Sequence, residues 1–143
     1  MNFSIDLIKW PENGRDANIL LKRLYARILN YIDIDFSGLQ HDPREIAENY
    51  IAFSATAKEC NNYENIYKSL LENEGFARNF RNNRAIEIRL AATLVHVDED
   101  HPRNLGEELS WFIELLGYRG EDESVIVDMV IDHFNGFIRH DNT

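Results

Sequence analysis

The chain has few residues that could stabilise a fold by means other than a packed core. Cys60 is the only cysteine, so no intramolecular disulfide can form, and a reducing compartment fits the sequence. The 143 residues include 3 prolines and no low-complexity tract, which argues against extended disorder. A chain of this length buries about 70% of its unfolded surface when it folds. We therefore expect one domain over residues 1–143, with one hydrophobic core.

The chain also lacks the segments that mark membrane proteins and the motifs that mark common enzymes. No stretch comes near the roughly 18 apolar residues of a membrane-spanning helix, and residues 1–10 lack the pattern of a signal peptide. No Gly-x-Ser-x-Gly turn, phosphate-binding loop or dinucleotide fingerprint is present. We therefore expect a soluble, cytoplasmic protein that has no membrane partner, uses no cofactor and is not an enzyme.

Positive charge is scarce, and the deficit is concentrated in one part of the chain. The formal net charge is −10. Residues 1–97 contain 12 Lys and Arg against 13 Asp and Glu, whereas residues 98–143 contain 3 against 12. The C-terminal third is therefore expected to repel nucleic acids and anionic lipids and to attract basic proteins. The alternative is that this charge serves solubility alone.

Helical periodicity, in contrast, is abundant. Apolar residues recur every three or four positions in six segments, separated by short loops. The pattern predicts an all-α fold, a compact single-domain bundle of six or seven helices. It turns Lys22, Arg23 and Arg27 outward on the first helix, and it places the last helix near the centre of the core. The expected helices cover about residues 16–32, 43–57, 62–73, 76–97, 104–116 and 124–138.

Capping residues support several of these helix ends. Asp42 before a proline is typical of a helix start, and Gly75 is placed for a left-handed helix end. Asp16 and Asn104 are further expected N-caps, and Glu107 is placed to complete a capping box with Asn104. These signals predict where four of the helices begin or end.

Two short segments alternate between apolar and polar residues with the period of a strand. The first covers residues 2–7, and the second covers residues 32–36. They could pair as a short two-stranded ribbon beside the helices. The first could equally be a helical turn, and the second a frayed helix end.

One cluster, at residues 96–101, has the chemistry of metal ligands. His96, Asp98, Glu99, Asp100 and His101 combine two imidazoles with three carboxylates, which suit zinc, manganese or iron. A small helical metal-dependent enzyme or ligand-binding domain that uses the His96–His101 cluster is our alternative function. The two histidines are five positions apart, however, and diverge on a continuous helix. We therefore expect no bound metal, and interpret the cluster as a helix end followed by an acidic turn.

The one basic stretch of the chain lies between residues 78 and 89. Arg78, Arg81, Arg84 and Arg89 are interleaved with aromatic and amide residues, a combination that can contact phosphate and bases. On a helix these arginines spread around the axis, and the overall charge opposes binding to nucleic acid. We expect them to form intramolecular ion pairs or a solvated face.

Trp111 is the candidate anchor for a protein partner. It falls outside the main apolar face of its helix, among glutamates. An exposed aromatic side chain ringed by carboxylates is typical of the centre of a protein interface. A second buried face of the same helix is the alternative. The predicted partner-binding residues are Glu107, Glu108, Trp111, Glu114, Glu121, Asp122 and Glu123.

These features predict an acidic protein-binding protein whose C-terminal third docks on a basic partner. Nuclease sites are basic because they hold phosphate, so an acidic protein can occlude them and associate with them rapidly. In size, charge and absence of catalytic motifs the chain resembles bacterial immunity proteins in general, although it carries no sequence signature of a family. Antiviral-defence or phage accessory proteins of similar size fit nearly as well. The most concrete expectation is a small cytosolic inhibitor, of the immunity or antitoxin type, that neutralises a nuclease toxin.

Overall fold

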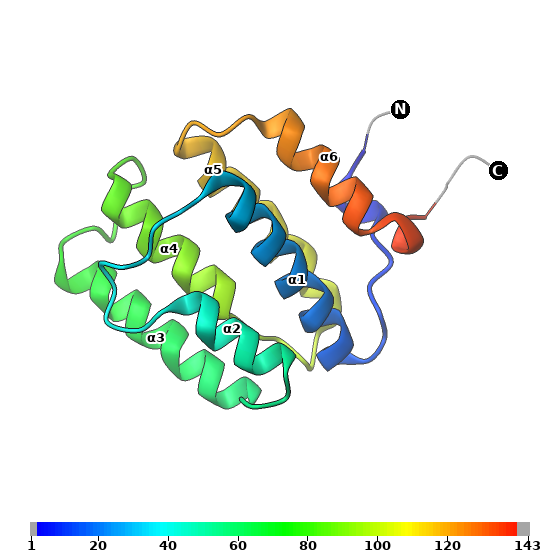
Figure 1. Ribbon diagram of the computed structural model, residues 1–143, viewed down its shortest axis with the longest axis horizontal. Coiled ribbons are helices and arrows are strands. Elements are labelled where there is room, and N and C mark those ends of the chain that lie inside the picture. The colour runs from blue at the N-terminus through cyan, green and yellow to red at the C-terminus, as the bar shows by residue number, and fades with distance from the viewer. Residues whose placement is uncertain (1–2, 140–143) are drawn as a thin grey trace.

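The structure, a computed structural model, describes residues 3–139 and confirms the all-α prediction (Figure 1). No strand is present in that range. The α-helices are α1 (Gly14–Ile32), α2 (Pro43–Ile51), α3 (Ala57–Asn73), α4 (Asn83–Val95), α5 (Leu105–Tyr118) and α6 (Glu123–His133). The short 3-10 helices are η1 (Ile5–Leu7), η2 (Pro102–Asn104) and η3 (Asn135–Phe137). None of the helices among the described residues is long and apolar enough to cross a membrane.

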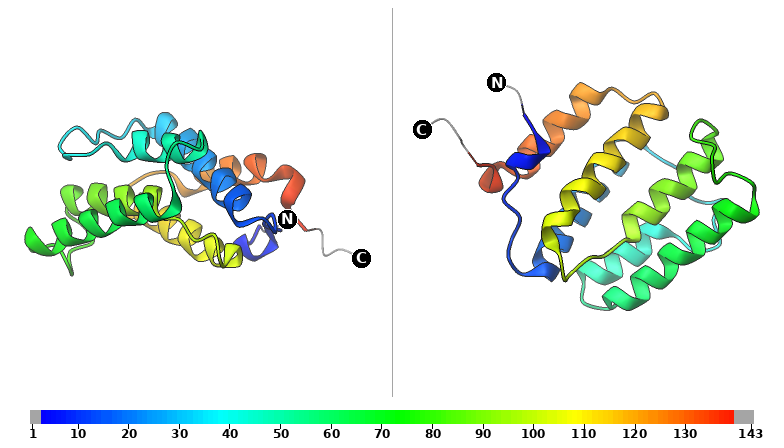
Figure 2. Two further views of the ribbon diagram at one scale, coloured as in Figure 1. Left: turned by 90° about the horizontal axis from the view of Figure 1, so that it is seen from below. Right: turned by 180° about the vertical axis from the view of Figure 1, so that it is seen from behind.

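The six α-helices form two layers. Figure 2 shows α6, α1 and α2 in one layer, and α5, α4 and α3 in the other. Across the layers α1 contacts α5 and α2 contacts α4, while neighbours within each layer also touch. Each loop joins two helices that follow one another in the sequence. The loops from α2 to α3 and from α5 to α6 cross between the layers, and the other loops stay within one layer.

The helix at the centre of the core is α4. Ten of its thirteen residues are buried, and it contacts α2, α3 and α5. A helix covered on so many sides is apolar around most of its circumference. We expected the last helix in this place, and that expectation is wrong. Within its bounds α6 buries Ile126 and Val130 alone, because it packs at the edge of its layer.

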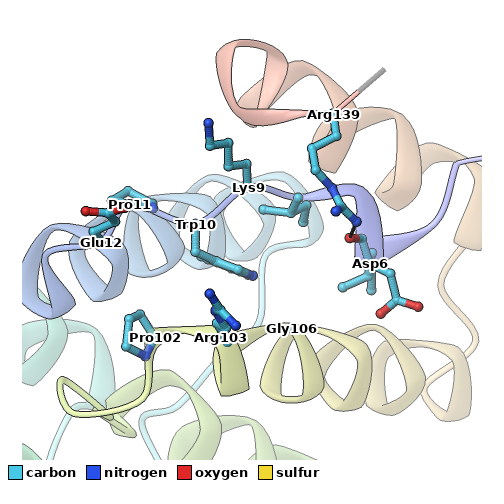
Figure 3. A pocket seen from close by; sticks show the side chains of 11 residues that line it. Asp6, Lys9, Trp10, Pro11, Glu12, Pro102, Arg103, Gly106 and Arg139 are labelled. Carbon is cyan, nitrogen blue, oxygen red and sulfur yellow. Dashed lines mark hydrogen bonds between the residues drawn. The ribbon is translucent and has the colours of Figure 1, made fainter. Parts of the chain in front are cut away.

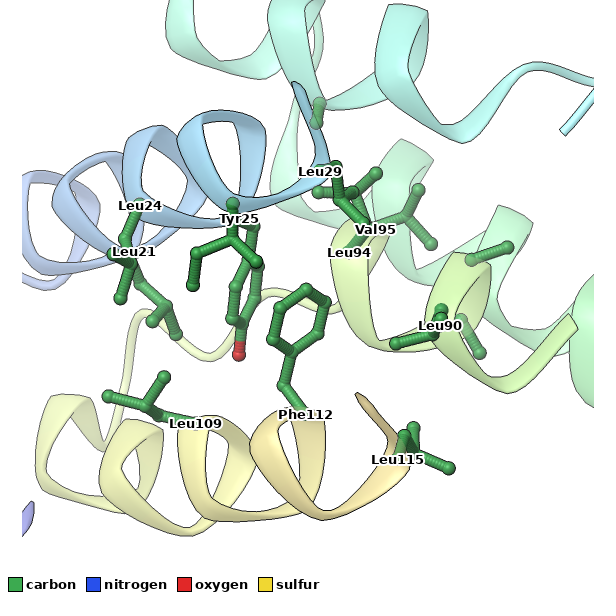
Figure 4. Packing of buried hydrophobic residues seen from close by; sticks show 14 of the residues in the cluster. Leu21, Leu24, Tyr25, Leu29, Leu90, Leu94, Val95, Leu109, Phe112 and Leu115 are labelled. Atoms are coloured by element: carbon green, nitrogen blue, oxygen red, sulfur yellow. The ribbon is translucent and has the colours of Figure 1, made fainter. Parts of the chain in front are cut away.

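An aromatic pair joins the two layers. Tyr25 of α1 stacks on Phe112 of α5 with their ring centroids 4.1 Å apart, and leucines of α1, α4 and α5, together with Val95 of α4, surround the pair (Figure 4). Both rings are almost completely buried. The hydroxyl of Tyr25 has no hydrogen-bond partner among the described residues. Burial and the nearby Glu108 charge raise the pKa of Tyr25.

The capping predictions are confirmed at two helix ends and wrong at two others. Asp42 caps α2, and Gly75 adopts a positive φ of 76° after α3. Asp16 is not a cap, because α1 begins earlier, at a cap formed by Asn13. Asn104 makes no side-chain cap bond. There η2 continues directly into α5, so the carbonyl of Pro102 accepts the hydrogen bond from the N–H of Leu105, the first residue of α5.

Three expected helices are shorter than the segments whose apolar periodicity predicted them. The last one was expected over residues 124–138, but α6 ends at His133 and residues 135–137 form η3. The expected helix of residues 76–97 begins instead at Asn83, where Asn82 accepts a cap bond. Residues 76–82 form a loop. The expected helix of residues 43–57 ends at Ile51, and Phe53 then has a positive φ of 63°. The cap bond of Asn82 fixes the start of α4, and the positive φ of Phe53 follows the end of α2, so these local features override the apolar periodicity.

The expected ribbon is not formed by the described residues. Residues 5–7 form η1, and Ile8 then pairs with Ile138 in an isolated antiparallel bridge. The amide of Arg139 donates to the carbonyl of Leu7 at 2.8 Å, which continues this pairing. Residues 32–36 are the end of α1 and the following turn. Residue 2, where the first alternation begins, lies outside the described range.

Candidate protein-binding site on α5

The helix α5 has two sides of opposite character. Its inner side buries five apolar residues. Positions 107, 111, 114 and 118 follow one another at intervals of four, three and four, so they share the other side of the helix. We call these four residues the outer face of α5, and they are Glu107, Trp111, Glu114 and Tyr118.

Aromatic side chains gather at this outer face. Phe80, from the loop before α4, lies edge-on to Trp111 with ring centroids 6.0 Å apart. Its ring centroid is also 6.4 Å from that of Tyr118. Phe80 is 40% and Tyr118 45% exposed, whereas Trp111 is half-buried. We call Phe80, Trp111 and Tyr118 the aromatic cluster.

Arg89 holds the loop that carries Phe80. Its guanidinium lies 4.2 Å from the centroid of the Phe80 ring. The same guanidinium donates hydrogen bonds to the backbone carbonyls of Phe76, Ala77 and Asn79. Because one buried cation satisfies three loop carbonyls, the loop is tied to α4. The exposed aromatic cluster therefore has a supported backbone.

The other arginines of the basic stretch divide into two kinds. Arg84 pairs with Glu74 at 3.2 Å and donates to the carbonyl of Gly38. Arg78 and Arg81 are exposed on the loop beside Phe80. The expectation of intramolecular ion pairs is confirmed for Arg84, whereas Arg89 pairs with carbonyls instead.

Two carboxylates of the outer face differ in their partners. Glu114 accepts a hydrogen bond from the Tyr118 hydroxyl at 2.9 Å. This bond raises the pKa of Tyr118, and the positive charge of Arg81 opposes the rise. Glu107 is exposed one turn before Trp111. The aromatic cluster therefore has carboxylates on the α5 side and arginines on the loop side.

Glu108, predicted beside Trp111, turns toward a hollow of about 210 Å³ between α3, α4 and α5. Trp111 and Glu108 both line it, so the hollow continues from the aromatic cluster. Glu64, which also lines the hollow, accepts a hydrogen bond from the Nδ1–H of His96 at 3.0 Å. The other ring nitrogen lies 3.7 Å from Glu108. His96 thus joins carboxylates from α3 and α5.

The charges around His96 shift one another. Burial lowers the pKa of His96, but the Glu64 hydrogen bond and the Glu108 charge outweigh it, so the net pKa is raised. Burial raises the pKa of Glu64, but His96 and Lys68 bring the net value below its ordinary one. For Glu108 burial prevails and the pKa rises. The group can hold a proton on His96 between two carboxylates.

The predicted acidic residues after α5 make local contacts. Asp122 caps α6 by accepting bonds from the backbone and hydroxyl of Ser124, and these bonds lower its pKa. Glu121 pairs with Arg119 at 2.8 Å. Glu123 is exposed and lines a hollow of about 550 Å³ together with Glu114. The structure therefore brings together Glu107, Trp111 and Glu114, with Glu108 at the adjoining hollow.

The His96–His101 cluster is not assembled around one point. His101 is exposed and contacts Asp98, whereas His96 faces Glu64 and Glu108. Within residues 3–139 no group of three His, Cys, Asp or Glu side chains is arranged to hold a metal ion. Residues 96–99 instead form a segment without regular secondary structure between α4 and η2, which we call the connector.

The connector is held by side chains from three other helices. Asn18 bonds both backbone groups of Asp98, and Asn61 bonds both backbone groups of Val97. The Tyr50 hydroxyl donates to the carboxylate of Glu99. Each asparagine side chain satisfies one backbone donor and one backbone acceptor, which is the full backbone complement of one residue. The connector is therefore a built part of the fold.

Lys22 completes this arrangement, and sequence reasoning placed it wrongly. It was expected to face outward, but it is 1% exposed. Its ammonium donates to the carbonyls of Leu94 and His96 at 2.7 and 2.8 Å. Burial lowers the pKa of Lys22 to about 8, against the attraction of nearby acidic groups. In the sequence Lys22 simply follows Leu21 on an amphipathic helix, and nothing in that pattern indicates that this lysine is buried.

The comparisons with known proteins give no relative. No family model matches the chain, and no curated protein and no solved structure is significantly similar to it.

Proposed function

We propose that the chain is a protein-binding protein that docks on a basic partner through the outer face of α5. The observation that carries this proposal is the aromatic cluster, which leaves Phe80 and Tyr118 substantially exposed beside the carboxylates of Glu107 and Glu114. Aromatic side chains at the centre of an interface supply much of the binding energy once they lose water.

The carboxylates and the aromatic cluster of this surface contribute to binding in different ways. Carboxylates at the rim attract a cationic partner over a distance, which raises the association rate and makes it sensitive to salt. The aromatic cluster then makes close contact, and its π faces can also accept a lysine or arginine side chain of the partner. Arg78 and Arg81 lie on the loop side of the cluster. They favour partners whose positive charge faces α5 and not the loop.

The specific form that we propose is a small inhibitor that occludes a basic enzyme, such as a nuclease toxin. It is supported by the concentration of negative charge in residues 98–143. A nuclease must present cationic groups to hold phosphate, so an acidic protein seated on its active site competes directly with nucleic acid. Inhibitors of this type need no catalytic group of their own.

The test uses the tagged protein as bait in cells of its source organism, with quantitative mass spectrometry. The Trp111→Ala variant and a Glu107→Lys, Glu114→Lys double variant are the test baits. Tyr31→Ala is the control, because Tyr31 is 62% exposed and belongs to α1, not to the outer face of α5. We expect a basic protein that the wild type and the control enrich and that both test baits lose.

Rate constants measured against the recovered partner then separate the two roles. The double charge reversal should slow association by at least about tenfold at low salt and flatten its salt dependence. Trp111→Ala should mainly speed dissociation. If neither change matters while Arg78→Gln and Arg81→Gln abolish binding, the partner is acidic and the proposal is overturned.

A further inference from the structure

A third hollow, of about 600 Å³, lies where the N-terminal segment meets the segment after η3 (Figure 3). It is formed by the segment after η1, the segment after η3, and the junction of η2 with α5. Its volume is in the range typical of small-molecule sites. None of its lining residues belongs to the outer face of α5, so it is a separate feature of the molecule.

The middle of this hollow is rich in hydrogen-bond donors. The indole nitrogen of Trp10 and the guanidinium of Arg103 point into the same space, and Arg139 approaches it from the opposite wall (Figure 3). Arg139 uses one N–H to bond the carbonyl of Asp6 at 2.7 Å. Within residues 3–139 no carboxylate lies within 4.0 Å of the charged nitrogens of Arg103 or Arg139.

Two of the three donors, Trp10 and Arg139, are held in place by the fold. The Trp10 ring packs edge-on against the buried Phe134, with centroids 5.2 Å apart. The backbone of Arg139 is fixed by its bond to Leu7, and its side chain by the bond to Asp6. Groups positioned in advance lose little entropy when they bind a ligand.

The floor of the hollow is left open at Gly106. A Cβ atom there would lie 3.8 Å from the indole nitrogen of Trp10 and 3.4 Å from a methyl group of Ile5. Both are ordinary contact distances, so packing does not demand glycine at this helical position. The absence of a side chain keeps space free directly beneath the indole N–H.

The charge of the hollow is opposite to that of the whole chain. Three basic side chains and two acidic ones line it, in a protein of net charge −10. The acidic ones, Asp6 and Glu12, lie at opposite edges in Figure 3, with Trp10 and Arg103 between them. The positive region is therefore short, which suits a single acid group and disfavours a polyanion such as nucleic acid.

We propose that this hollow binds a small organic anion, a phosphate monoester that carries a flat ring. The acid group lies between Arg103 and Arg139, whose planar guanidinium groups match its oxygens. The indole N–H of Trp10 donates a third bond, and the ring of the ligand packs against Trp10 and Pro102. This site is independent of the protein-binding surface that we propose on α5.

The test titrates the full-length ¹⁵N-labelled protein with phenyl phosphate at constant ionic strength and follows the two tryptophan indole N–H signals by NMR. The Trp111→Phe variant assigns them. We expect the Trp10 signal to shift with half-saturation at about 1–10 mM, a typical affinity for so small a ligand, while the Trp111 signal stays in place. Inorganic phosphate should bind at least about fivefold more weakly, because it lacks the ring.

Matched variants separate the site from general charge. Arg103→Gln should weaken binding at least about fivefold, because it removes a planar cation from the site. Lys58→Gln removes the same charge from an exposed position on α3 and should change binding less than about twofold. The proposal is overturned if the Trp10 signal does not saturate, if phenol shifts it as phenyl phosphate does, or if the two variants weaken binding equally.

Discussion

The connector and the outer face of α5 are both rich in polar side chains, yet the molecule uses them in opposite ways. In the connector, the backbone groups of Val97 and Asp98 are each bonded by an asparagine from another helix, and Lys22 binds the carbonyls beside them. On the outer face of α5, Glu114 bonds Tyr118 one turn away. The polar groups of the connector bond to other parts of the fold, whereas those of the outer face of α5 remain exposed to solvent.

This difference shows how a polar cluster should be judged. The connector has the better composition for chemistry, with two histidines and three carboxylates in and next to it. Its groups are nevertheless satisfied by the chain itself, which is what a structural role requires. The outer face of α5 combines exposed aromatic rings with few internal partners, and that is the character of an interaction surface. The number of internal partners separates the two more clearly than residue type.

The largest expected effect separates the two sides of α5 itself. Phe112→Ala should lower the free energy of unfolding by about 3–5 kcal/mol, because it removes the ring that stacks on Tyr25. Trp111→Ala, on the outer side, should cost less than about 1.5 kcal/mol. Urea denaturation monitored by circular dichroism measures both. Equal losses would show that Trp111 is part of the core.

Lys22 gives the next largest effect and tests the connector directly. Lys22→Met keeps the length of the side chain but leaves the carbonyls of Leu94 and His96 without their donor. We expect a loss of about 2–3 kcal/mol at pH 7. The neighbouring Arg23→Met is the control, because Arg23 is exposed, and it should cost less than about 0.5 kcal/mol. A stable Lys22→Met protein would mean that the connector does not depend on this cation.

Replacing glycine by alanine is expected to change the stability of the protein in opposite directions at two positions. A Cβ at Gly14 would overlap the carbonyl of Glu99 in the connector, so Gly14→Ala should cost about 1–3 kcal/mol. At Gly117, on α5, nothing lies within 4 Å of an added Cβ. Gly117→Ala should therefore stabilise the protein by up to about 1 kcal/mol through helix propensity. Thermal unfolding compares the two. Stabilisation by Gly14→Ala would contradict the close packing of α1 on the connector, and destabilisation by Gly117→Ala would contradict the open space beside that glycine.

The smallest effect concerns pH. The raised pKa of His96 means that its contribution to stability is complete below its ordinary value of 6.5 and is lost as pH rises through the folded-state value. The lowered pKa of Glu64 makes its contribution complete above 4.5 and lost as pH falls through the folded-state value. Relative to wild type, His96→Gln should therefore lose most stability between these limits. Denaturation from pH 4 to 8 measures this, and Glu64→Gln should weaken the same dependence, with the part due to the Glu108 charge remaining.

Periodicity and capping predicted much of the fold. Six α-helices are present within residues 3–139, and Asp42 and Gly75 mark the ends that their chemistry indicates. The centre of the core was misplaced, because α4 and α6 are both strongly apolar and periodicity does not say which is covered on more sides. Lys22 was misplaced for a related reason. A lysine buried against helix-end carbonyls looks, in sequence, like any other solvated lysine.

The candidate site could be predicted only in part. Trp111, Glu107 and Glu114 share one helix, so their common face follows from spacing alone. Phe80 was not connected to them in advance, because contact between the loop before α4 and α5 is a tertiary property. Tyr118 was missed because the expected helix ended at residue 116, whereas α5 continues to Tyr118. The donor-rich hollow around Trp10 was missed for the same reason, since Arg103 and Arg139 are far from Trp10 in sequence.

The pairing of the two ends of the chain has a consequence for the order of folding. Asp6 and Arg139 are separated by 133 residues, so their contact closes a very long loop. Because closing such a loop costs conformational entropy, we expect this contact to form late in folding, after the helices have packed. Such a contact also opens first, by local fluctuation without unfolding of the core. The amide of Arg139 should then exchange with solvent deuterium long before those of α4. A ligand held between Trp10 and Arg139 would slow that exchange selectively, because it binds only when the two ends are joined.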